Sequence, residues 1–510
     1  MLSTPSTLPW IWTAAVFIFG VVQVLLLLYS SHRLLTLRRW GRTRHRAPTP
    51  GVEPATWPRV TVQLPVYNER AVVERLIDAA ATLDYPAQLL QIQVLDDSTD
   101  ETFERARERV EYWRRQGRDI ELRHREDRAG FKAGALAAGL ERARGEIIVI
   151  FDADFVPAAD FLRRIIPRFS DPRIGMVQAR WGHLNRDRSA LTVAQAVMLD
   201  AHFHLEHEAR MSAGLFFNFN GTAGAWRRAC IEDAGGWAHD TLTEDLDLSY
   251  RAQLKGWRFV AATDIAAPAE LPADVLALKS QQRRWAKGSI QTARKVLPGL
   301  LRSNLPARVK LEATIHLTAN VTYPLLLLSG LLLPAVLAIP NTLPWRIAVL
   351  LDVSAIVCGV LPVVAFLYAG QLAAGRSRAS RPRELMSALV VGAGLTLNNT
   401  VAVLGGLRKS LGDWERTPKT GEAAGTQGQR EYTALHDPSA VLELLLALFF
   451  AGVIAVAVHE GRFRSVPFLL LLAVGLGYVG AGSLLEAVKM RPLPRNIMPP
   501  VPARRIEERT

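Results

Sequence analysis

Two aspartates separated by one residue, Asp152 and Asp154, end an apolar run of isoleucines and valines that starts at Glu146. Such a run is typical of a buried parallel strand, and residues two apart on a strand point to the same side. We therefore expect both carboxylates at the carboxyl end of the strand, where ligands bind in open α/β sheets. Two carboxylates there suit a divalent cation that also holds a diphosphate. The simpler alternative is a pair of solvated turn residues.

A second acidic stretch and a lysine are expected near the same place. Asp96 and Asp97 follow a strand-like run and precede Ser98 and Thr99, either of which could cap the next helix. That assignment leaves the two aspartates free to accept hydrogen bonds from a ribose or a base. Lys132 opens another predicted helix, against the preference of the helix dipole. The lysine becomes reasonable if a phosphate binds at the same helix terminus.

Glu244 and Asp245 fall in the first turn of a predicted helix, which Thr243 could cap and which ends near Gly256. Acidic residues are expected there from the helix dipole alone, so a structural role is one interpretation. The other is catalytic, because a carboxylate held ionised at a helix start can accept a proton.

Gln281, Arg284 and Trp285 lie in the stretch QQRRWAKGS, on a helix expected at a membrane interface. Anchoring at the membrane surface is the simpler interpretation. The alternative is that Arg284 pairs with a diphosphate and that Trp285 presents its ring to a sugar.

The elements that must position these residues are four strand-like runs that alternate with helical patterns between residues 60 and 154. This alternation predicts a parallel, Rossmann-like sheet with right-handed crossovers. The polar loops after the strands then meet at one sheet edge, beside the aspartate pair. One of these loops, PVYNER, contains Pro65, Tyr67 and Glu69.

Long apolar blocks place the rest of the chain in a membrane. The sequence has 510 residues and a formal net charge of +13. Residues 9–29 form a run long enough to span a bilayer and too long for a signal peptide. Arginines cluster after this run, at residues 376–383 and at residues 489–505, which is typical of the cytoplasmic side. No base-reading motif accompanies the positive charge, so we expect no nucleic-acid partner. The 2 cysteines exclude a disulfide framework and a cysteine zinc site.

Four motifs occur together and in order: LDDS, FDADF, TED and QQRRW, the last of which matches QxxRW. Together they resemble the family 2 inverting glycosyltransferases of the cellulose synthase and hyaluronan synthase superfamily. The likeness is greatest to cellulose synthase-like proteins of the (gluco)mannan synthase type and covers residues 60–302. The resemblance implies an α/β GT-A domain, with a Rossmann-like, mixed and mostly parallel sheet, inserted between transmembrane helices.

The resemblance also implies a role for each motif. Asp245, with Glu244, would be the general base, and Asp152 and Asp154 would hold Mg or Mn on the donor diphosphate. Phe155 follows the aspartate pair where some members place histidine, which puts an acceptor contact at that position in doubt. The implied donor-binding residues are Pro65, Tyr67, Glu69, Asp96, Asp97, Lys132, Asp152, Gln281, Arg284, Thr417 and Lys419, and the implied acceptor-binding residues are Trp285, Gly221 and Thr222.

Apolar runs at about residues 317–339, 346–368, 440–458 and 467–488 predict four further spans, for five in total. The stretch GDWERTPKTG resembles the gating loop of cellulose synthase, with Thr417 and Lys419 in the matching positions; a flexible linker is the alternative. A loop that contacts a cytoplasmic nucleotide must be cytoplasmic, so residues 388–407 should form an interfacial or re-entrant helix. Arg462 and Arg464 then fall in an outside loop, against the usual charge bias.

The predicted organisation puts the catalytic domain and the carboxyl terminus in the cytoplasm and the chain in the inner (plasma) membrane. His316, Asn320 and Asn398 are polar groups at or within the membrane, and we hypothesise that they line a path for a growing glycan. The expected parts are a first transmembrane helix (1–31), a basic Pro-rich linker (32–58), the GT-A domain (59–300), an interfacial helix with spans 2 and 3 (301–372), an interfacial or re-entrant helix with the gating-like loop (373–437), spans 4 and 5 (438–490) and a basic tail (491–510).

The predicted function is processive synthesis of a β-linked glucan, mannan or glucomannan from UDP-glucose or GDP-mannose, with secretion through the spans. The expected partners are the nucleotide-sugar donor, a glycan acceptor and the lipid bilayer; the sequence identifies no export partner. The alternative is a single-transfer enzyme that glycosylates a lipid such as diacylglycerol or ceramide. A third interpretation, an inactive scaffold, would require the loss of a catalytic carboxylate, and none is missing.

Overall fold

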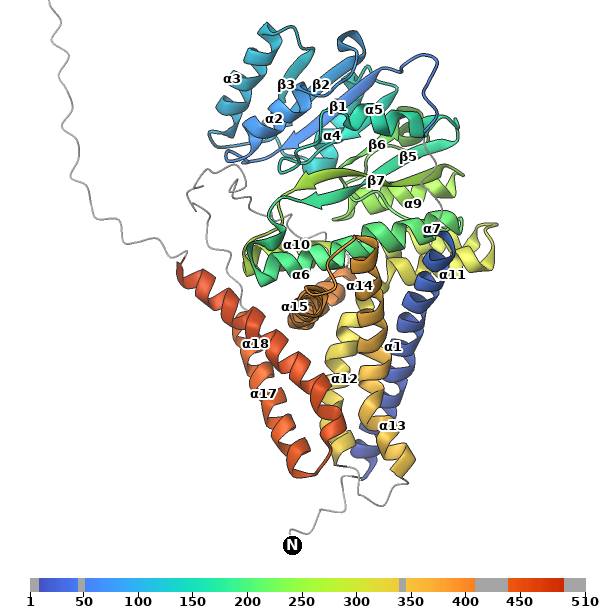
Figure 1. Ribbon diagram of the computed structural model, residues 1–510, viewed down its shortest axis with the longest axis vertical. Helices are drawn as coiled ribbons and strands as arrows, with labels where there is room; N and C mark the ends of the chain where they lie inside the picture. Colours follow the sequence, from blue (N-terminus) through green and yellow to red (C-terminus); the bar gives the residue numbers. More distant parts are fainter. Residues whose placement is uncertain (1–8, 45–50, 339–344, 409–438, 490–510) are drawn as a thin grey trace, which may run out of the picture.

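The computed structural model describes residues 9–44, 51–338, 345–408 and 439–489. A sheet covered by helices lies at one end, and long helices extend from it to the other end (Figure 1). The predicted Thr417 and Lys419 lie outside the described residues.

The sheet has seven strands in the order β3-β2-β1-β4-β6-β5-β7. Strands β1 to β4 pair in parallel, as the alternation of strands and helices predicts. Strand β6 is antiparallel to both of its neighbours, so the sheet is mixed and mostly parallel. The strands are β1 (Val60–Val66), β2 (Leu90–Asp96), β3 (Ile120–His124), β4 (Ile147–Ile150), β5 (Ile174–His183), β6 (Gly224–Arg227) and β7 (Arg258–Ala269).

Two hydrophobic cores, one on each face of the sheet, explain why the central strand β4 is apolar throughout. On β4, Ile147 and Val149 belong to the core beneath α2 and α3, whereas Ile148 and Ile150 belong to the core beneath α4. Successive side chains of a strand point to opposite faces, so a strand covered on both sides buries all of its side chains. The buried polar residues of β1 and β2 bind one another: Thr61 donates to Gln91 at 2.8 Å and Gln63 donates to Gln93 at 3.1 Å.

The helices of this domain cover the sheet and lie between it and the long helices at the other end (Figure 1). They are α2 (Val73–Ala81), α3 (Thr102–Arg115), α4 (Phe131–Arg142), α5 (Phe161–Ile165), α6 (Ala190–Ala201), α7 (Glu208–Ser212), α8 (Arg228–Asp233), α9 (Glu244–Leu254), α10 (Val275–Arg302) and α11 (Ala307–Leu317).

Five helical spans are long and apolar enough to cross a membrane within the described ranges, as the sequence predicts. They contain α1 (Pro9–Thr43), α12 (Thr322–Leu337), α13 (Trp345–Ala355) continued by α14 (Leu361–Ala373), α17 (Ser439–His459) and α18 (Val466–Lys489).

Two further helices, α15 (Arg381–Gly394) and α16 (Thr396–Gly406), are bent by 48° at a short break. They make a broken span or a re-entrant segment and occupy the stretch where an interfacial or re-entrant helix is expected.

Helix α1 differs from the expectation that a linker begins at residue 32, because it remains helical to Thr43. Leucines and other good helix formers continue through the basic segment, and no proline interrupts it before Pro48. The arginines of this segment are therefore carried on a rigid extension of the first span.

Arg462 forms a buried ion pair with Asp352, with its Nη2 2.6 Å from Oδ1. Its charge is neutralised by this carboxylate, so Arg462 gives little indication of which side of the membrane the loop occupies.

Candidate active site

A pocket opens at the carboxyl edge of the sheet, where loops from several strands meet the first turns of α9 and the middle of α10. Most of the residues singled out in the sequence line it, although they are spread over more than 200 positions. These are Pro65, Tyr67, Glu69, Asp97, Lys132, Asp152, Asp154, Gly221, Glu244, Asp245, Gln281, Arg284 and Trp285.

Asp96 and Asp97 are not free, contrary to the expectation. Asp96 is fully buried and its Oδ2 lies 2.6 Å from His124 Nδ1. Asp97 accepts two hydrogen bonds from the guanidinium of Arg125, at 2.7 and 2.6 Å. The cause is the strand register: β3 pairs with β2 so that His124 lies opposite Asp96. Only Asp97 reaches the pocket.

The helix after this loop is also not capped as expected. Helix α3 begins at Thr102, whose N–H donates to Asp100 Oδ1 at 2.9 Å. Ser98 instead accepts a hydrogen bond from the backbone N–H of Asn68, at 2.8 Å. This bond ties the loops after β1 and β2 together beneath the pocket.

The aspartate pair lies on a turn, because β4 already ends at Ile150. The alternation of side chains along a strand therefore does not explain why both carboxylates line the pocket. The turn is held instead by Thr222, which is buried and whose hydroxyl accepts the backbone N–H of Asp152 at 2.8 Å. Asp154 is 4 % exposed, and the following Phe155 is buried against the ring of Trp181.

Lys132 joins three parts of the site. Its Nζ lies 2.5 Å from Asp152 Oδ1 and 2.9 Å from the carbonyl oxygen of Gly221. Burial lowers the pKa of Lys132, but the charges of Asp152 and Glu244 outweigh it and leave the pKa raised. The lysine is therefore a permanent cation at the start of α4, placed where a phosphate could replace its carboxylate partner.

Three residues around the pocket that are not glycine have positive φ angles, a strained backbone conformation. Asn68, Phe131 and Ala223 have φ angles of 54°, 51° and 53°. Each is next to a predicted site residue, and such strain persists where the surrounding structure fixes it, often at functional sites.

Gly221 has a φ of +80°, and a Cβ atom there would lie 3.1 Å from Asp245 Oδ2. Only glycine combines this conformation with this close approach. Gly221 therefore lets the loop before β6 come directly against the first turn of α9.

The carboxyl group of Asp245 has a raised pKa. Burial raises its pKa to about 7, with a further contribution from the neighbouring charge of Glu244, while Lys132 opposes the rise. A base whose pKa lies near the working pH is efficient in proton transfer. Thr243 does not cap the helix with its side chain; its hydroxyl lies 3.2 Å from that of Thr292 on α10.

Helix α10 carries Gln281, Arg284 and Trp285 along one wall. Burial lowers the pKa of Arg284, and the charges of Glu244 and Asp152 oppose this effect. The first two backbone N–H groups of α10 donate to the carboxylate of Glu486 on α18, at 2.8 and 2.9 Å. A membrane helix thus caps and positions the catalytic one.

Several pocket residues were not identified from the sequence. The guanidinium of Arg128 lies 3.3 Å from the ring centroid of Tyr67, and Trp181 and His183 come from the end of β5. The ring centroids of Trp181 and Trp285 are 6.3 Å apart, so two tryptophans lie close together in the pocket wall. Arg128 follows Glu126 and Asp127 in a mixed-charge loop. Its closeness to Lys132 in the sequence is the feature that could have identified it as a pocket residue.

The pocket can hold a divalent cation together with a substrate. No group of three or more metal-ligating side chains exists among the residues that the structure describes. Asp152 and Asp154 both line the pocket, and Mg²⁺ is commonly bound by one or two carboxylates plus substrate phosphates. The donor set therefore fits a cation that arrives with a diphosphate.

The polar residues at the membrane level contact the catalytic helices. His316 Nδ1 lies 2.7 Å from the hydroxyl of Tyr250 on α9, and Asn320 donates to Ser289 on α10 at 2.8 Å. Asn398 accepts hydrogen bonds from Arg283 at 3.1 and 3.0 Å. None of them lines the described pocket, and a role in a glycan path stays a prediction.

Comparison with known proteins gives consistent results. Residues 58–288 match the family described as "Glycosyltransferase like family 2". Glucomannan 4-beta-mannosyltransferase 1 from Oryza sativa subsp. japonica is 34% identical over 483 residues, which are 87% of this chain and 88% of the relative. Glucomannan 4-beta-mannosyltransferase 2 from Arabidopsis thaliana is 46% identical over 254 residues, 49% of this chain and 48% of the relative.

A solved structure has the same fold. The mannosyltransferase PcManGT from Pyrobaculum calidifontis, in complex with GDP-Man and Mn2+, aligns with a TM-score of 0.51 and 24% identity. The alignment covers 76% of this chain and 100% of that chain. The sheet domain is therefore GT-A-like.

Proposed function

The chain belongs to glycosyltransferase family 2, among its cellulose synthase-like members, and from this premise we propose that it is a processive inverting synthase of a β-linked mannan, glucomannan or glucan. It is a hexosyltransferase with membrane helices, of the polysaccharide-synthesising kind. Among the two donors considered, the names of the plant relatives favour GDP-mannose over UDP-glucose.

In the proposed reaction, a hydroxyl oxygen of the acceptor attacks the anomeric carbon of the donor sugar. The bond from that carbon to the diphosphate breaks, and the nucleoside diphosphate leaves. Asp245 accepts the hydroxyl proton, so the carboxyl is formed as the glycosidic bond is formed. Direct displacement inverts an α-linked donor to a β-linked product.

The leaving diphosphate carries the negative charge that must be stabilised. A cation held by Asp152 and Asp154 would supply Lewis-acid charge neutralisation when bound. Lys132 and Arg284 face the same pocket and would bind phosphate oxygens. Asp97 and the loop with Pro65, Tyr67 and Glu69 would hold the nucleoside, and Gln281, Gly221 and Trp285 would complete the donor and acceptor sites. Thr222, expected from the sequence to bind the acceptor, is fully buried and is not among the residues that line the pocket, so its proposed part is to hold the aspartate turn.

The observation that carries this proposal is the meeting of Asp245, with its pKa near 7, and the cationic Lys132 across Gly221. A displacement at the anomeric carbon needs a proton acceptor for the attacking hydroxyl and a cation for the leaving phosphate. Asp245 and Lys132 would supply these two groups on either side of Gly221.

The test is to incubate membrane vesicles with radiolabelled GDP-mannose and UDP-glucose and to digest the product with linkage-specific glycanases. Ethanol-insoluble label that a β-mannanase or a β-glucanase releases supports the proposal. Label that partitions into the organic phase would instead identify a lipid acceptor, and would overturn the polymer assignment.

We further propose that the catalytic domain faces the cytoplasm at the inner membrane, where nucleotide sugars are made. The arginines on the extension of α1 and in the loop after α14 support this orientation, because they lie at the ends of spans next to the catalytic domain (Figure 1). Protease added to intact cells should leave the GT-A domain uncleaved, whereas cleavage of that domain would contradict the orientation.

A further inference from the structure

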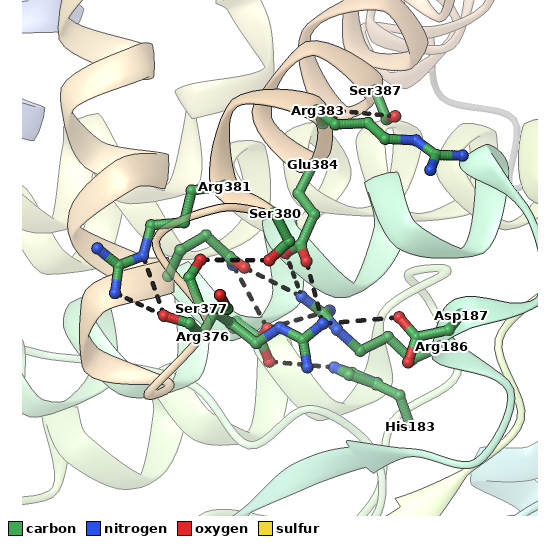
Figure 2. Close-up of polar contacts among 12 residues, drawn as sticks. His183, Arg186, Asp187, Arg376, Ser377, Ser380, Arg381, Arg383, Glu384 and Ser387 are labelled. Carbon is green, nitrogen blue, oxygen red and sulfur yellow. Dashed lines mark hydrogen bonds and ion pairs between the residues drawn. The ribbon is translucent and has the colours of Figure 1, made fainter.

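A polar network with a buried centre and an exposed edge at Asp187 connects the pocket wall to helices α14 and α15, and Figure 2 shows most of its members converging. It is separate from the donor-binding residues and has no role in the proposed reaction. Its members come from β5, the turn after it, α6, α14, the α14–α15 loop and α15: His183, Arg186, Asp187, Asp200, Gln371, Arg376 and Glu384.

Arg186 is the centre of this network. Its Nη2 lies 2.8 Å from Glu384 Oε2 and 3.0 Å from Gln371 Oε1, and its Nη1 lies 3.3 Å from Asp200 Oδ2. The side chain of Arg186 is only 10% exposed. One guanidinium therefore joins the catalytic domain to two membrane helices.

On the catalytic side, the network ends at the pocket. Asp200 Oδ1 lies 3.3 Å from His183 Nε2, and His183 lines the pocket together with Trp181. Leu199, next to Asp200 on α6, lines it as well. A displacement of Arg186 would therefore reach the pocket wall through a single carboxylate.

On the membrane side, the second carboxylate oxygen of Glu384 accepts from Arg376 at 3.0 Å. Close packing reinforces the polar contacts, because a Cβ atom on Gly370 of α14 would lie 2.6 Å from the Cβ of Ala201 on α6. The two helices are thus in backbone contact, and α6 cannot slide along α14 without breaking the network.

The wall that this network holds lies beside the site of the cation and the diphosphate, not within it. Asp152, Asp154 and Lys132 mark the diphosphate position, and Asp97 with Tyr67 marks the nucleoside position under the proposed function. The remaining wall, with Trp181, His183 and Leu199, faces Trp285 and is the part left for the acceptor.

We propose that Arg186 and Glu384 are positioning residues for the acceptor: they fix the Trp181–His183 wall relative to α14 and α15 and thereby determine how firmly the growing chain is retained between additions. This inference rests on the proposed function. A polymer that must enter the membrane from the pocket needs both structures in a constant relative position, and an ion pair buried at their junction supplies it.

A purely structural role would also explain a buried ion pair, since removing one partner of such a pair destabilises proteins in general. The ion pair between Arg462 and Asp352 offers a matched control, because it is also buried and joins the connection between α17 and α18 to α13. This connection and α13 lie at the end of the spans far from the sheet (Figure 1). A general loss of stability should appear in both variants, whereas an effect on the acceptor should appear in only one.

The experiment compares the full-length wild type, Glu384→Gln and Asp352→Asn in vesicles, with the donor that the wild type uses and β-linked oligosaccharides of the same sugar as added acceptors. For Glu384→Gln we expect a KM for the acceptor raised roughly tenfold, since small misplacements of a bound reactant have effects of this size or larger. The KM for the donor should stay within about twofold of the wild type, and the polymer should be shorter. Asp352→Asn should keep the wild-type product length.

Equal changes in the KM of donor and acceptor, or an unchanged product length in a folded Glu384→Gln enzyme, would overturn the proposal. If that variant does not fold, Arg186→Lys replaces it: lysine keeps the charge but cannot contact Glu384 and Gln371 with one planar group. It should shorten the polymer in the same way, and wild-type length would again refute the idea. If the wild type itself forms no polymer, the proposed function is refuted. If the wild type forms polymer and the variants have the same product length and acceptor KM, only the positioning role is refuted.

Discussion

Asp245 should make the protein less stable as the pH rises, and its replacement by asparagine should remove this effect. Its pKa rises from an ordinary 3.8 to about 7 in the folded protein. Below pH 4, Asp245 is protonated in both the folded and the unfolded state, so it costs nothing. Between pH 4 and pH 7 only the unfolded state releases its proton, which favours unfolding. Above pH 7 the penalty is constant.

The size of the penalty follows from the change in pKa. At about 1.4 kcal/mol per pH unit, a rise from 3.8 to about 7 corresponds to about 4 kcal/mol above pH 7. This is an upper value, because Asp245 lines a pocket and solvent there screens part of the effect. About 2 to 3 kcal/mol of the total develops between pH 5 and pH 8. Asp245→Asn keeps the shape and removes the charge, so it should gain stability over the wild type by this amount across the interval.

The assay is thermal unfolding of both proteins in detergent at pH 5 and pH 8, followed by tryptophan fluorescence. We expect the Tm advantage of Asp245→Asn to grow by roughly 5 °C between the two pH values. Its synthase activity should fall at least roughly 100-fold, the loss expected without a general base. Asp84→Asn is the control, since the Asp84 side chain is 62% exposed. A Tm difference that is equal at pH 5 and pH 8 would refute the perturbed pKa, and retained activity would refute the base.

Three further outcomes are expected. Treatment with EDTA should abolish activity, and Mg²⁺ or Mn²⁺ should restore it, because the pocket offers two carboxylates, Asp152 and Asp154, for a cation; full activity in EDTA would exclude the cation. Gly221→Ala should lower kcat at least roughly tenfold, because its Cβ would meet Asp245; Gly117→Ala has a similar φ of +82° in open space and should keep activity. Arg284→Lys should raise the KM for the donor roughly tenfold, because lysine could not make the bidentate phosphate contact proposed for Arg284, and an effect confined to the acceptor would reassign Arg284.

The sequence predicted the parts of the fold that depend on local patterns. The strands β1 to β4 are short strand-like runs that alternate with helical patterns, and the spans are long apolar blocks, so each could be located without knowledge of its neighbours. Strands β5, β6 and β7 were not predicted. Strand β5 contains glycine, glutamine and arginine, and its pairing with β7 joins residues about 84 positions apart, for example Ile174 and Arg258.

The residues of the candidate site that could be predicted are those in short motifs of charged side chains. The aspartate pair follows an apolar strand, and Lys132 lies at a helix start where the helix dipole disfavours a cation. Asp245 was identified from the motif that it shares with Glu244, because the helix dipole alone already explains an acidic residue at that position. The partners of Asp96 and Asp97 were missed, because they come from the last residue of β3 and the residue after it, and depend on a strand register that the sequence does not display. The acceptor-side wall was missed for the same reason: Trp181 and His183 gain a role only when β5 ends beside α10.

The contact between Glu486 and the amino end of α10 makes the catalytic domain difficult to separate from the membrane helices. Helix α10 belongs to the catalytic domain in sequence, yet its terminal N–H groups find their acceptor on the last described helix, more than 200 residues further along. Lys279, one turn later, adds an ion pair with Glu443 of α17 at 2.7 Å. A soluble fragment cut at the end of the family match would therefore lack the anchor of the helix that carries Gln281, Arg284 and Trp285, and we expect the minimal active unit to include α17 and α18.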